Sequence, residues 1–296
     1  MITRRELLVH ASAAASACTL MTLASAVRGG TPSAETLEGR FAAIEAKMGG
    51  RLGVAVHGTG SGLKATRRGD ERFPLCSTFK WLAAAALLKR VDQGHETLDR
   101  PIPLRADKIV TYSPETEKHV GQTMTLGSIC EAAITLSDNT AGNLMLEALG
   151  GPDGFNAYAR ELGDTATRLD RIEPELNEAA PDDPRDTTTP LTMAADLNAV
   201  LVGEALTPAS RDQLNGWLAA NTTGAARLRA GLPANWRVGD KTGTCNSHTA
   251  NDVGIAWPPN GKPVLIAVYV AESNASRDEQ NAAIADVARA VAAVIG

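Results

Sequence analysis

The sequence lacks the features by which nucleic-acid-binding proteins are recognised. It contains no block of lysine and arginine, and aromatic residues make up only 4% of its 296 residues, so aromatic and basic side chains do not interleave. The formal net charge is −5. Because binding to nucleic acid requires a basic surface, we expect no nucleic acid partner.

Metal-binding patterns and an internal membrane-spanning run are also missing. The five histidines form neither an H-x-H nor an H-E-x-x-H arrangement, so we expect no metal and no other cofactor. The last apolar run, residues 281–296, is too short to cross a membrane and carries Asp286 and Arg289. We expect a helix there and no membrane span.

The longest apolar stretch lies near the N-terminus. It runs from Leu7 to Val27, follows Arg4-Arg5 and ends in the small-residue site Ala24-Ser25-Ala26. This pattern is typical of export signals, and residues 1–26 are predicted to be a signal peptide. Thr3 to Leu8 is similar to a twin-arginine signal, and an ordinary secretory signal with a chance arginine pair is the alternative. Both predict a periplasmic protein.

Four short motifs carry the chemistry of the chain. In order, they are Ser77-Thr78-Phe79-Lys80, Ser137-Asp138-Asn139, Glu173-Pro174-Glu175-Leu176-Asn177 and Lys241-Thr242-Gly243. Together they supply a hydroxyl nucleophile, two lysines, a second hydroxyl, and a carboxylate with an amide, which suffices to make and break an acyl-enzyme. Each exact tripeptide is expected by chance on the order of 0.03–0.05 times per chain, so their joint occurrence indicates function.

The S-x-x-K pattern occurs twice, and its surroundings separate the two copies. Ser61 and Lys64 lie around a glycine-rich turn between two strand-like runs. Ser77 opens an apolar run that ends at Gly94, which predicts the N-terminus of a helix with Lys80 one turn on. A lysine amine beside a serine hydroxyl can act as its base, so Ser77 is the candidate nucleophile.

The order of predicted elements indicates two lobes. Strands are predicted toward both ends of the chain, over 52–57, 64–68, 236–244, 250–257 and 263–271. Helices are predicted over 34–47, 77–92, 126–136, 139–149, 152–162, 190–203, 207–219 and 281–296. We expect an α/β fold of the α+β type, one catalytic domain in which 27–67 and 221–296 form an α/β lobe and 68–220 an all-helical lobe.

The four motifs resemble those of the class A serine β-lactamases, and the similarity extends from about Leu37 to the C-terminus. It includes Tyr112-Ser113-Pro114 and Arg185-Asp186-Thr187-Thr188. The resemblance implies a β-lactamase/transpeptidase-like fold, with an antiparallel five-stranded sheet flanked by helices plus an all-helical lobe. It implies an enzyme that acts on small β-lactam molecules, and we expect a monomer.

The resemblance also implies how the acyl-enzyme forms and is hydrolysed. Ser77 is the nucleophile, and either Lys80 or Glu173, the latter through a water, removes its proton. Backbone N–H groups of Ser77 and Thr244 form the oxyanion hole. Glu173 and Asn177 hold the water that deacylates the enzyme.

Further residues are assigned to proton transfer and substrate binding on the same basis. Ser137 passes a proton to the leaving nitrogen with the help of Lys241. The residues expected to bind substrate are Asn139, Thr242, Gly243, Thr244, Arg227, Tyr112 and Thr223. Arg227 is expected to supply the arginine near the substrate carboxylate, and a surface position is the alternative for it.

Residues 168–186 are predicted to form a compact Ω-type loop that carries Glu173. The segment breaks the helical pattern with prolines and acidic residues. Arg171 and Asp186 lie near its two ends and could pair across its neck, or remain two solvated surface charges. In the family this pair is buried, and the bond that matches Glu173-Pro174 is cis.

Cysteine usage is consistent with an exported protein. Cys76 precedes the nucleophile and Cys245 follows Thr244, so the two are neighbours if the motifs meet in one site. We expect a disulfide between them, and two buried free thiols are the alternative. Cys130 is expected to be a packed free thiol.

These features predict a hydrolase that opens the β-lactam amide of penicillins and cephalosporins (EC 3.5.2.6) and gives antibiotic resistance. The cysteine pair, Thr223 and Arg227 resemble the carbapenem-hydrolysing branch of the family, which extends the expected substrates to carbapenems. Asn246 departs from the pattern of that branch, because close relatives often carry glycine at this position. The alternatives are a penicillin-binding protein or sensor that stays acylated, and a D-Ala-D-Ala peptidase.

Overall fold

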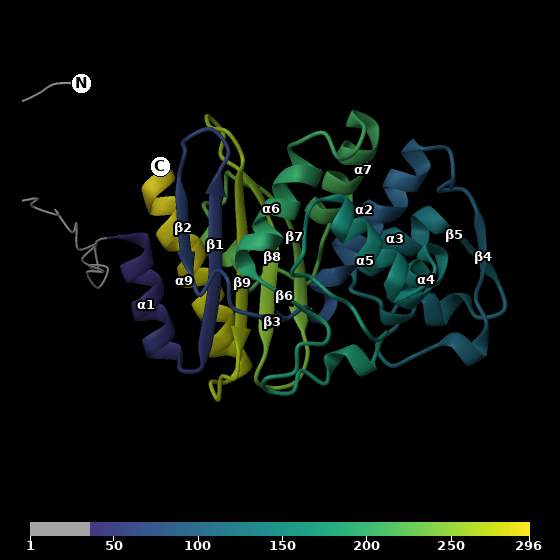
Figure 1. Cartoon of the computed structure of the whole chain (residues 1–296), viewed down its shortest axis with the longest axis horizontal. Helices are drawn as coiled ribbons and strands as arrows, with labels where there is room; N and C mark the ends of the chain where they lie inside the picture. The colour runs from purple at the N-terminus through teal and green to yellow at the C-terminus, as the bar shows by residue number, and fades with distance from the viewer. Residues whose placement is uncertain (1–35) are drawn as a thin grey trace, which may run out of the picture. The chain divides into compact units, whose positions relative to one another are not determined.

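The computed structural model describes residues 36–296 (Figure 1). The chain divides into two units, Met1–Thr31 and Pro32–Gly296, and the fold is that of the second. The predicted signal peptide and its cleavage site lie outside the described residues.

A five-stranded antiparallel sheet with strand order β2-β1-β9-β8-β7 forms the centre of this unit. Its strands are β1 (Arg51–Gly58), β2 (Lys64–Arg67), β7 (Arg237–Thr244), β8 (Ala250–Trp257) and β9 (Val264–Ala271). β1 and β2 precede the helical part of the chain and the other three follow it. The prediction that both ends of the chain build one sheet is therefore confirmed.

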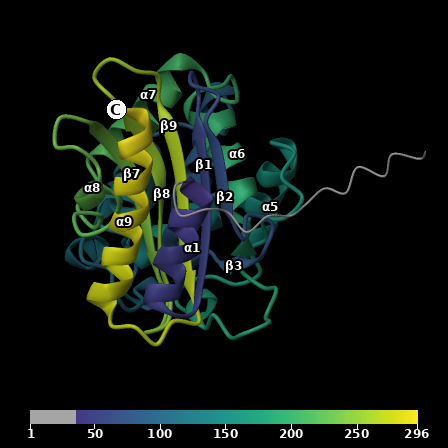
Figure 2. The same ribbon diagram turned by 90° about the vertical axis from the view of Figure 1, so that its left-hand side faces the viewer.

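Both faces of the sheet are buried, as the alternation along β9 illustrates. Leu265, Ala267 and Tyr269 belong to one hydrophobic cluster, whereas Val264 and Ile266 belong to the other. Successive side chains of a strand point to opposite faces, so each cluster fills one side. The helices over one face are α1 (Leu37–Met48), α8 (Leu228–Gly231) and α9 (Arg277–Ile295), and Figure 2 shows α1 beside α9.

The remaining α-helices come from the middle of the chain. They are α2 (Phe79–Asp92), α3 (Leu126–Thr135), α4 (Asn139–Leu149), α5 (Pro152–Glu161), α6 (Pro190–Leu201) and α7 (Pro208–Ala219), each within two residues of its predicted bounds. Every residue of α2 from Phe79 to Leu88 is buried. A helix that is buried all round is expected at the centre of a helical cluster, and it carries Lys80 there.

Short elements absent from the sequence prediction complete the helical part. Two antiparallel pairs occur, β3 (Phe73–Pro74) with β6 (Thr187–Thr188) and β4 (Pro101–Pro103) with β5 (Thr123–Thr125). The 3-10 turns are η1 (Cys76–Thr78), η2 (Ala106–Lys108), η3 (Thr116–His119) and η4 (Glu175–Asn177). Strands of two or three residues are too short to establish a hydrophobic period, so no pattern in the sequence predicts them.

Three helix starts differ from the predicted ones by two residues or more. The helix expected at Ser77 begins as η1, and α2 follows it. The first helix begins at Leu37 because the Thr36 hydroxyl accepts the backbone N–H of Gly39. The last begins at Arg277, before the predicted 281, because Ser276 and Glu279 form a capping box.

The helices of the middle segment are not all remote from the sheet. α6 packs on β1, β8 and β9, and α7 packs on β7, although both lie within the segment 68–220. The division into an α/β lobe and a helical lobe at these boundaries therefore stays a prediction.

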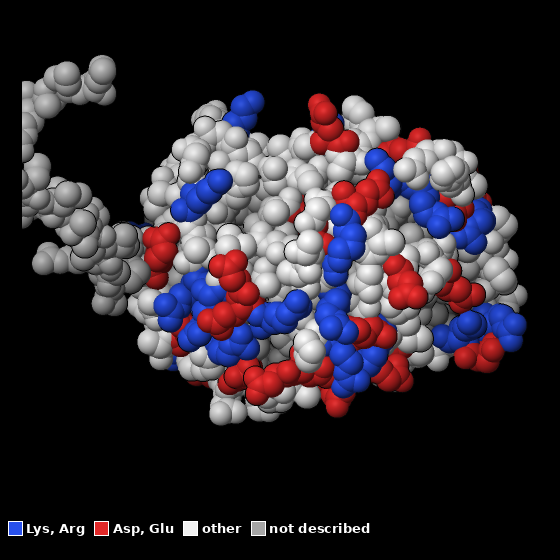
Figure 3. All heavy atoms as spheres, in the orientation of Figure 1, with Lys and Arg blue, Asp and Glu red and all other residues white. Residues whose placement is uncertain are grey.

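Surface charges of both signs are interspersed on the face shown in Figure 3. Many of them are paired. Arg51, for example, contacts Glu71 at 3.0 Å and Glu272 at 2.8 Å. Within residues 36–296, no helix is long and apolar enough to cross a membrane.

Candidate active site

Ser77 lies in the 3-10 turn η1, where β3 leads into α2. Its Oγ accepts a hydrogen bond from Lys80 Nζ at 2.9 Å. Lys80 Nζ also donates to the carbonyl oxygen of Ser137 at 2.8 Å and to Oδ1 of Asn139 at 2.7 Å. Burial lowers the pKa of Lys80, and the Glu173 carboxylate opposes that shift. The lysine of the first motif is thus fixed between Ser77 and the second motif.

The carboxylate of Glu173 also contacts Ser77 and Lys80. Its Oε1 lies 3.2 Å from Ser77 Oγ and 3.0 Å from Lys80 Nζ, and Glu173 and Lys80 are both fully buried at their side chains. Its Oε2 accepts a hydrogen bond from Nδ2 of Asn177. One carboxylate therefore contacts the Ser77 hydroxyl, the Lys80 amine and the Asn177 amide.

Asn143 holds the backbone of Glu173 and was missed in the sequence. Its Nδ2 donates to the Glu173 carbonyl oxygen and its Oδ1 accepts the Glu173 N–H, both at 2.8 Å. The available signal was its spacing, because Asn143 lies four residues after Asn139 and thus on the same face of α4.

The neck of the Ω-type loop is closed by Arg171 and Asp186. Arg171 Nε lies 2.6 Å from Asp186 Oδ2, and Asp186 is only 1% exposed. Asp186 Oδ1 accepts the backbone N–H groups of Asp170 and Arg171 at 2.7 and 2.9 Å. The predicted pair is confirmed, and the alternative of two solvated charges is wrong. The Glu173-Pro174 peptide bond is cis, as expected.

The second lysine approaches from the sheet. Lys241 Nζ donates to Ser137 Oγ at 3.0 Å and to the carbonyl oxygen of Thr242 at 2.8 Å. Burial lowers the pKa of Lys241 well below its usual value, and the positive charge of Lys80 adds to the shift. The hydroxyl of Ser137 thus faces an amine whose proton is unusually easy to remove.

Arg227 is buried rather than on the surface, with 6% of its area exposed. Its guanidinium donates to the carbonyl oxygens of Gly243 and Asn251 at 2.9 and 2.6 Å, and to Thr244 Oγ1 at 2.7 Å. Thr223 Oγ1 lies 2.5 Å from Thr242 Oγ1. The surface alternative for Arg227 is therefore wrong, and its charge lies beside the end of β7.

These residues surround a cleft of about 410 Å³. It is lined by Ser77, Tyr112, Ser137, Asn139, Asn177, Thr223, Arg227, Thr242, Thr244 and Cys245. Tyr112 is 57% exposed. Lys80, Glu173 and Lys241 are buried behind this lining, where they contact Ser77 and Ser137. All four motifs therefore meet at one cleft, and Gly243 lies close behind it on β7.

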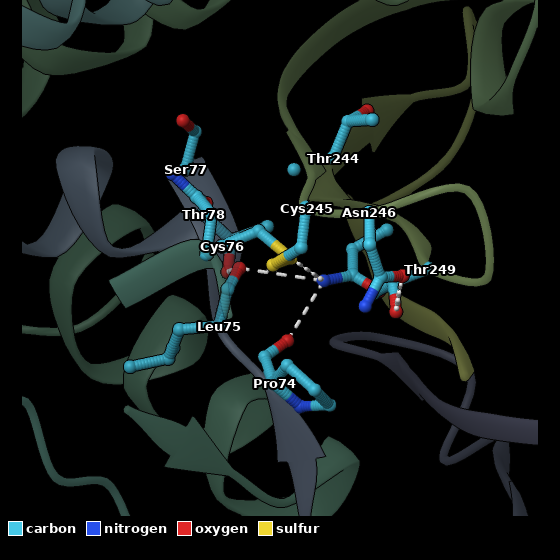
Figure 4. The surroundings of a disulfide bond; sticks show 12 residues. Pro74, Leu75, Cys76, Ser77, Thr78, Thr244, Cys245, Asn246 and Thr249 are labelled. Carbon is cyan, nitrogen blue, oxygen red and sulfur yellow. Dashed lines mark hydrogen bonds between the residues drawn. A yellow bond between two sulfur atoms is a disulfide. The ribbon is translucent and has the colours of Figure 1, made fainter. Parts of the chain in front are cut away.

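A disulfide between Cys76 and Cys245 joins the turn η1, which contains Ser77, to the end of β7 (Figure 4). Their Cα atoms are 5.4 Å apart although the residues are 169 positions apart in sequence. The predicted bridge is confirmed, and the alternative of two free thiols is wrong. Cys130 is a buried free thiol, as expected, and burial raises its pKa to about 12. In the described part of the chain, no group of three or more His, Cys, Asp or Glu residues could hold a metal ion.

Comparisons with known proteins agree on one family. The family model described as the β-lactamase enzyme family matches residues 36–295. Beta-lactamase AST-1 of Nocardia asteroides is 48% identical over 298 residues, covering 99% of this chain and 96% of that protein. Beta-lactamase CTX-M-8 of Citrobacter amalonaticus is 44% identical over 258 residues, covering 87% of this chain and 89% of that protein.

Solved structures give the same result. An ancestral (GNCA) class A β-lactamase is 59% identical with a TM-score of 0.86, over 88% of this chain and 100% of that one. The putative class A β-lactamase PenP from Rhodopseudomonas palustris is 56% identical with a TM-score of 0.86, over 87% of this chain and 99% of that one.

Proposed function

The chain belongs to the class A β-lactamases, hydrolases that open β-lactams, and we propose that its acyl-enzyme cycle runs through the residues around the cleft. The observation that carries the proposal is the position of Glu173. Its Oε1 lies within 3.2 Å of Ser77 Oγ and 3.0 Å of Lys80 Nζ. A carboxylate there can activate a water against an ester on Ser77.

Acylation begins with attack of Ser77 Oγ on the lactam carbonyl carbon. Lys80 can take the Ser77 proton directly across 2.9 Å, and its lowered pKa makes the neutral amine accessible. Glu173 can take the same proton through a water. Either base leaves Ser77 Oγ free to form the bond to carbon while negative charge develops on the carbonyl oxygen.

That charge would be stabilised by the backbone N–H groups of Ser77 and Thr244. In support, Ser77 and Thr244 follow and precede the two bridged cysteines, so they lie on facing segments (Figure 4). Removal of one donor from such a pair typically costs about 10²–10³ in rate. The disulfide thus lies directly beside the proposed oxyanion hole.

Collapse of the tetrahedral species breaks the C–N bond of the lactam. The leaving nitrogen takes the proton of the Ser137 hydroxyl, and Ser137 Oγ takes a proton in turn from the Lys241 ammonium, which donates to it across 3.0 Å. Burial favours this transfer, because it lowers the pKa of Lys241.

Substrate binding would use the wall of the cleft formed by β7. Arg227 and the hydroxyls of Thr223, Thr242 and Thr244 form a cationic, donor-rich surface suited to the substrate carboxylate. Asn139 would bind the side-chain amide, and Tyr112 would cover the edge of the cleft.

Deacylation distinguishes a β-lactamase from a penicillin-binding protein, which stays acylated. Glu173 and Asn177 would hold the hydrolytic water against the ester, and Glu173 would take its proton. Mass spectrometry after mixing with a penicillin tests this. Rapid return to the free mass is expected, whereas a persistent adduct on Ser77 would favour an acylated sensor. Turnover of a D-Ala-D-Ala peptide but not of penicillin would favour the peptidase.

We extend the proposal to carbapenems, supported by the Cys76–Cys245 bridge and by Thr223 and Arg227 at the cleft. Steady-state turnover of a penicillin, an oxyimino-cephalosporin and a carbapenem side by side tests it. A carbapenem that acylates the enzyme without turnover would refute the extension and leave the β-lactamase assignment intact.

We also propose a monomeric periplasmic enzyme, exported by way of residues 1–26. Fusion of this segment to a reporter that is active only after export, with Arg4 and Arg5 changed to lysine in a second version, tests the route. Loss of export in the second version supports the twin-arginine route, and unchanged export supports an ordinary secretory signal.

A further inference from the structure

The turn that precedes Ser77 has an unfavourable backbone conformation. Cys76 has φ of +44°, a left-handed conformation that residues other than glycine adopt only when the surrounding structure imposes it. The disulfide holds this turn through Cys76, and the Leu75 N–H donates to the Asp186 carbonyl oxygen at 2.8 Å. Any further contact that fixes the turn also fixes the nucleophile beside it.

Asn251 supplies such a contact from the sheet. It lies on β8, is fully buried, and its Nδ2 donates to the carbonyl oxygen of Pro74 at 2.8 Å. The same nitrogen lies 3.3 Å from the Leu75 carbonyl oxygen and 3.6 Å from Cys76 Sγ. Figure 4 draws these bonds as dashed lines beside the disulfide. One amide therefore contacts each of the three residues before Ser77.

The orientation of this amide is set by its partners. Pro74 and Leu75 present carbonyl oxygens, which only accept hydrogen bonds, so the NH₂ group must face them. Asn251 Oδ1 has no hydrogen-bond partner among the described residues. A buried acceptor without a partner is unfavourable, so the Oδ1 of Asn251 does not stabilise the fold. The contacts of its NH₂ group are the better explanation for an asparagine at this position.

Gly243 of the fourth motif leaves the space that this contact needs. It lies opposite Asn251 in the β7–β8 register. A Cβ at position 243 would come within 2.9 Å of the Leu75 carbonyl oxygen and 3.3 Å of Asn251 Nδ2. The glycine thus lets the turn, β7 and the Asn251 side chain approach one another.

The backbone of Asn251 serves the other half of the site. Its carbonyl oxygen accepts from Arg227 at 2.6 Å. A substitution of the side chain leaves this bond in place. The two contributions of Asn251 can therefore be separated by experiment.

We propose that Asn251 is a positioning residue that holds the turn before Ser77 through its side-chain amide and so orients the Ser77 hydroxyl for acylation. The inference rests on the proposed function of Ser77. It acts on acylation alone, because Asn251 contacts neither Glu173 nor Asn177 in the hydrogen bonds of the described residues.

The test is the acylation step of Asn251→Leu, which keeps the size of the side chain and removes the donor. Stopped-flow measurement with a chromogenic cephalosporin over a range of concentrations gives the acylation rate constant and the dissociation constant separately. We expect the rate constant to fall about 10- to 100-fold, as for other small misplacements of reacting groups, and the dissociation constant to stay unchanged because Arg227 keeps its backbone partner.

The acyl-enzyme provides a second readout. Slower acylation with normal deacylation lowers the fraction of acylated enzyme at steady state, so intact mass should show mainly free enzyme. Asn215→Leu is the matched control, because Asn215 is a buried asparagine with an unpartnered Oδ1 on α7, away from the cleft. It should leave both constants unchanged.

The outcomes separate the inference from the proposed function. A wild-type protein that forms no adduct on Ser77 would overturn both. A wild type that turns over penicillin beside an Asn251→Leu variant with a normal acylation rate would overturn the inference alone, as would equal losses in Asn251→Leu and Asn215→Leu. If Asn251→Leu is not recovered folded, Asn251→Ala carries the same prediction.

Discussion

Lys80 Nζ and Glu173 Oε1 lie 3.0 Å apart, with neither side chain exposed. The same oxygen lies 3.2 Å from Ser77 Oγ. A buried charge is costly unless it is paired, and the Glu173 carboxylate favours the charged form of Lys80. The pair couples the group proposed to start acylation to the group proposed to complete deacylation.

Glu173→Gln is therefore expected to trap the acyl-enzyme. The amide keeps the shape of the side chain but cannot take a proton from water, so deacylation should slow by about 10²–10⁴. Intact mass after mixing with a penicillin should show a persistent adduct on Ser77. Glu175→Gln, an exposed change two residues on, should turn over normally. Normal turnover by Glu173→Gln would refute the assigned role.

A pair of buried carboxyl groups, Asp164 and Asp196, predicts a pH dependence of stability. Burial and then the neighbouring Asp164 raise the pKa of Asp196 to about 9 from its usual 3.8, and Arg160 opposes the shift. Tyr158 and Tyr269 are further titratable groups close enough to interact electrostatically with Asp196. In the folded protein Asp196 is thus protonated at neutral pH, whereas in the unfolded chain it is ionised.

Because the folded state binds the extra proton, the free energy of unfolding falls as pH rises from about 4 and levels off above about 9. Asp196→Asn removes this dependence, and it should raise the free energy of unfolding by on the order of 1–3 kcal/mol at pH 8 and change it little at pH 4.5. Urea unfolding at several pH values measures this. The exposed Asp212→Asn on α7 is the control, and the same pH slope in both variants would contradict the prediction.

Periodicity and motif order predicted much of this molecule. The sheet and the helices around it were predictable because a strand or helix with a buried face repeats apolar residues at a fixed spacing. The cysteines beside Ser77 and Thr244 predicted the bridge because the flanking motifs had to converge. The four motifs meet at one cleft, as their shared chemistry required.

The contacts that fix the site were harder to predict because they join residues far apart in sequence without periodicity. Asn143 holds the backbone of Glu173, and Asn251 contacts residues 74–76 across 175 positions or more. Each is a single polar residue in an otherwise regular element. Only the packing of α4 on the loop, and of β8 on the turn, gives either one its partner.

The disulfide is expected to contribute substantially to stability. It closes a loop of 169 positions, and the chain-entropy model together with measured cases gives about 2–4 kcal/mol. Cys76→Ala with Cys245→Ala should lower the unfolding free energy by that amount and remove the sensitivity of the midpoint to reductant. Cys130→Ala is the control and should keep that sensitivity. A double variant as stable as wild type would contradict the prediction.

The neck of the Ω-type loop should affect deacylation more than acylation. Asp186 accepts two backbone N–H groups and pairs with Arg171, so Asp186→Asn removes the charge that orders the loop carrying Glu173. Breaking a buried pair costs about 3–5 kcal/mol, and the partial exposure of Arg171 places this pair at the lower end. Single-turnover kinetics should show near-normal acylation and a deacylation rate reduced about 10-fold or more. The exposed Asp182→Asn in the same loop should match wild type. Equal slowing of both steps in Asp186→Asn would mean that the neck supports Ser77 as much as Glu173.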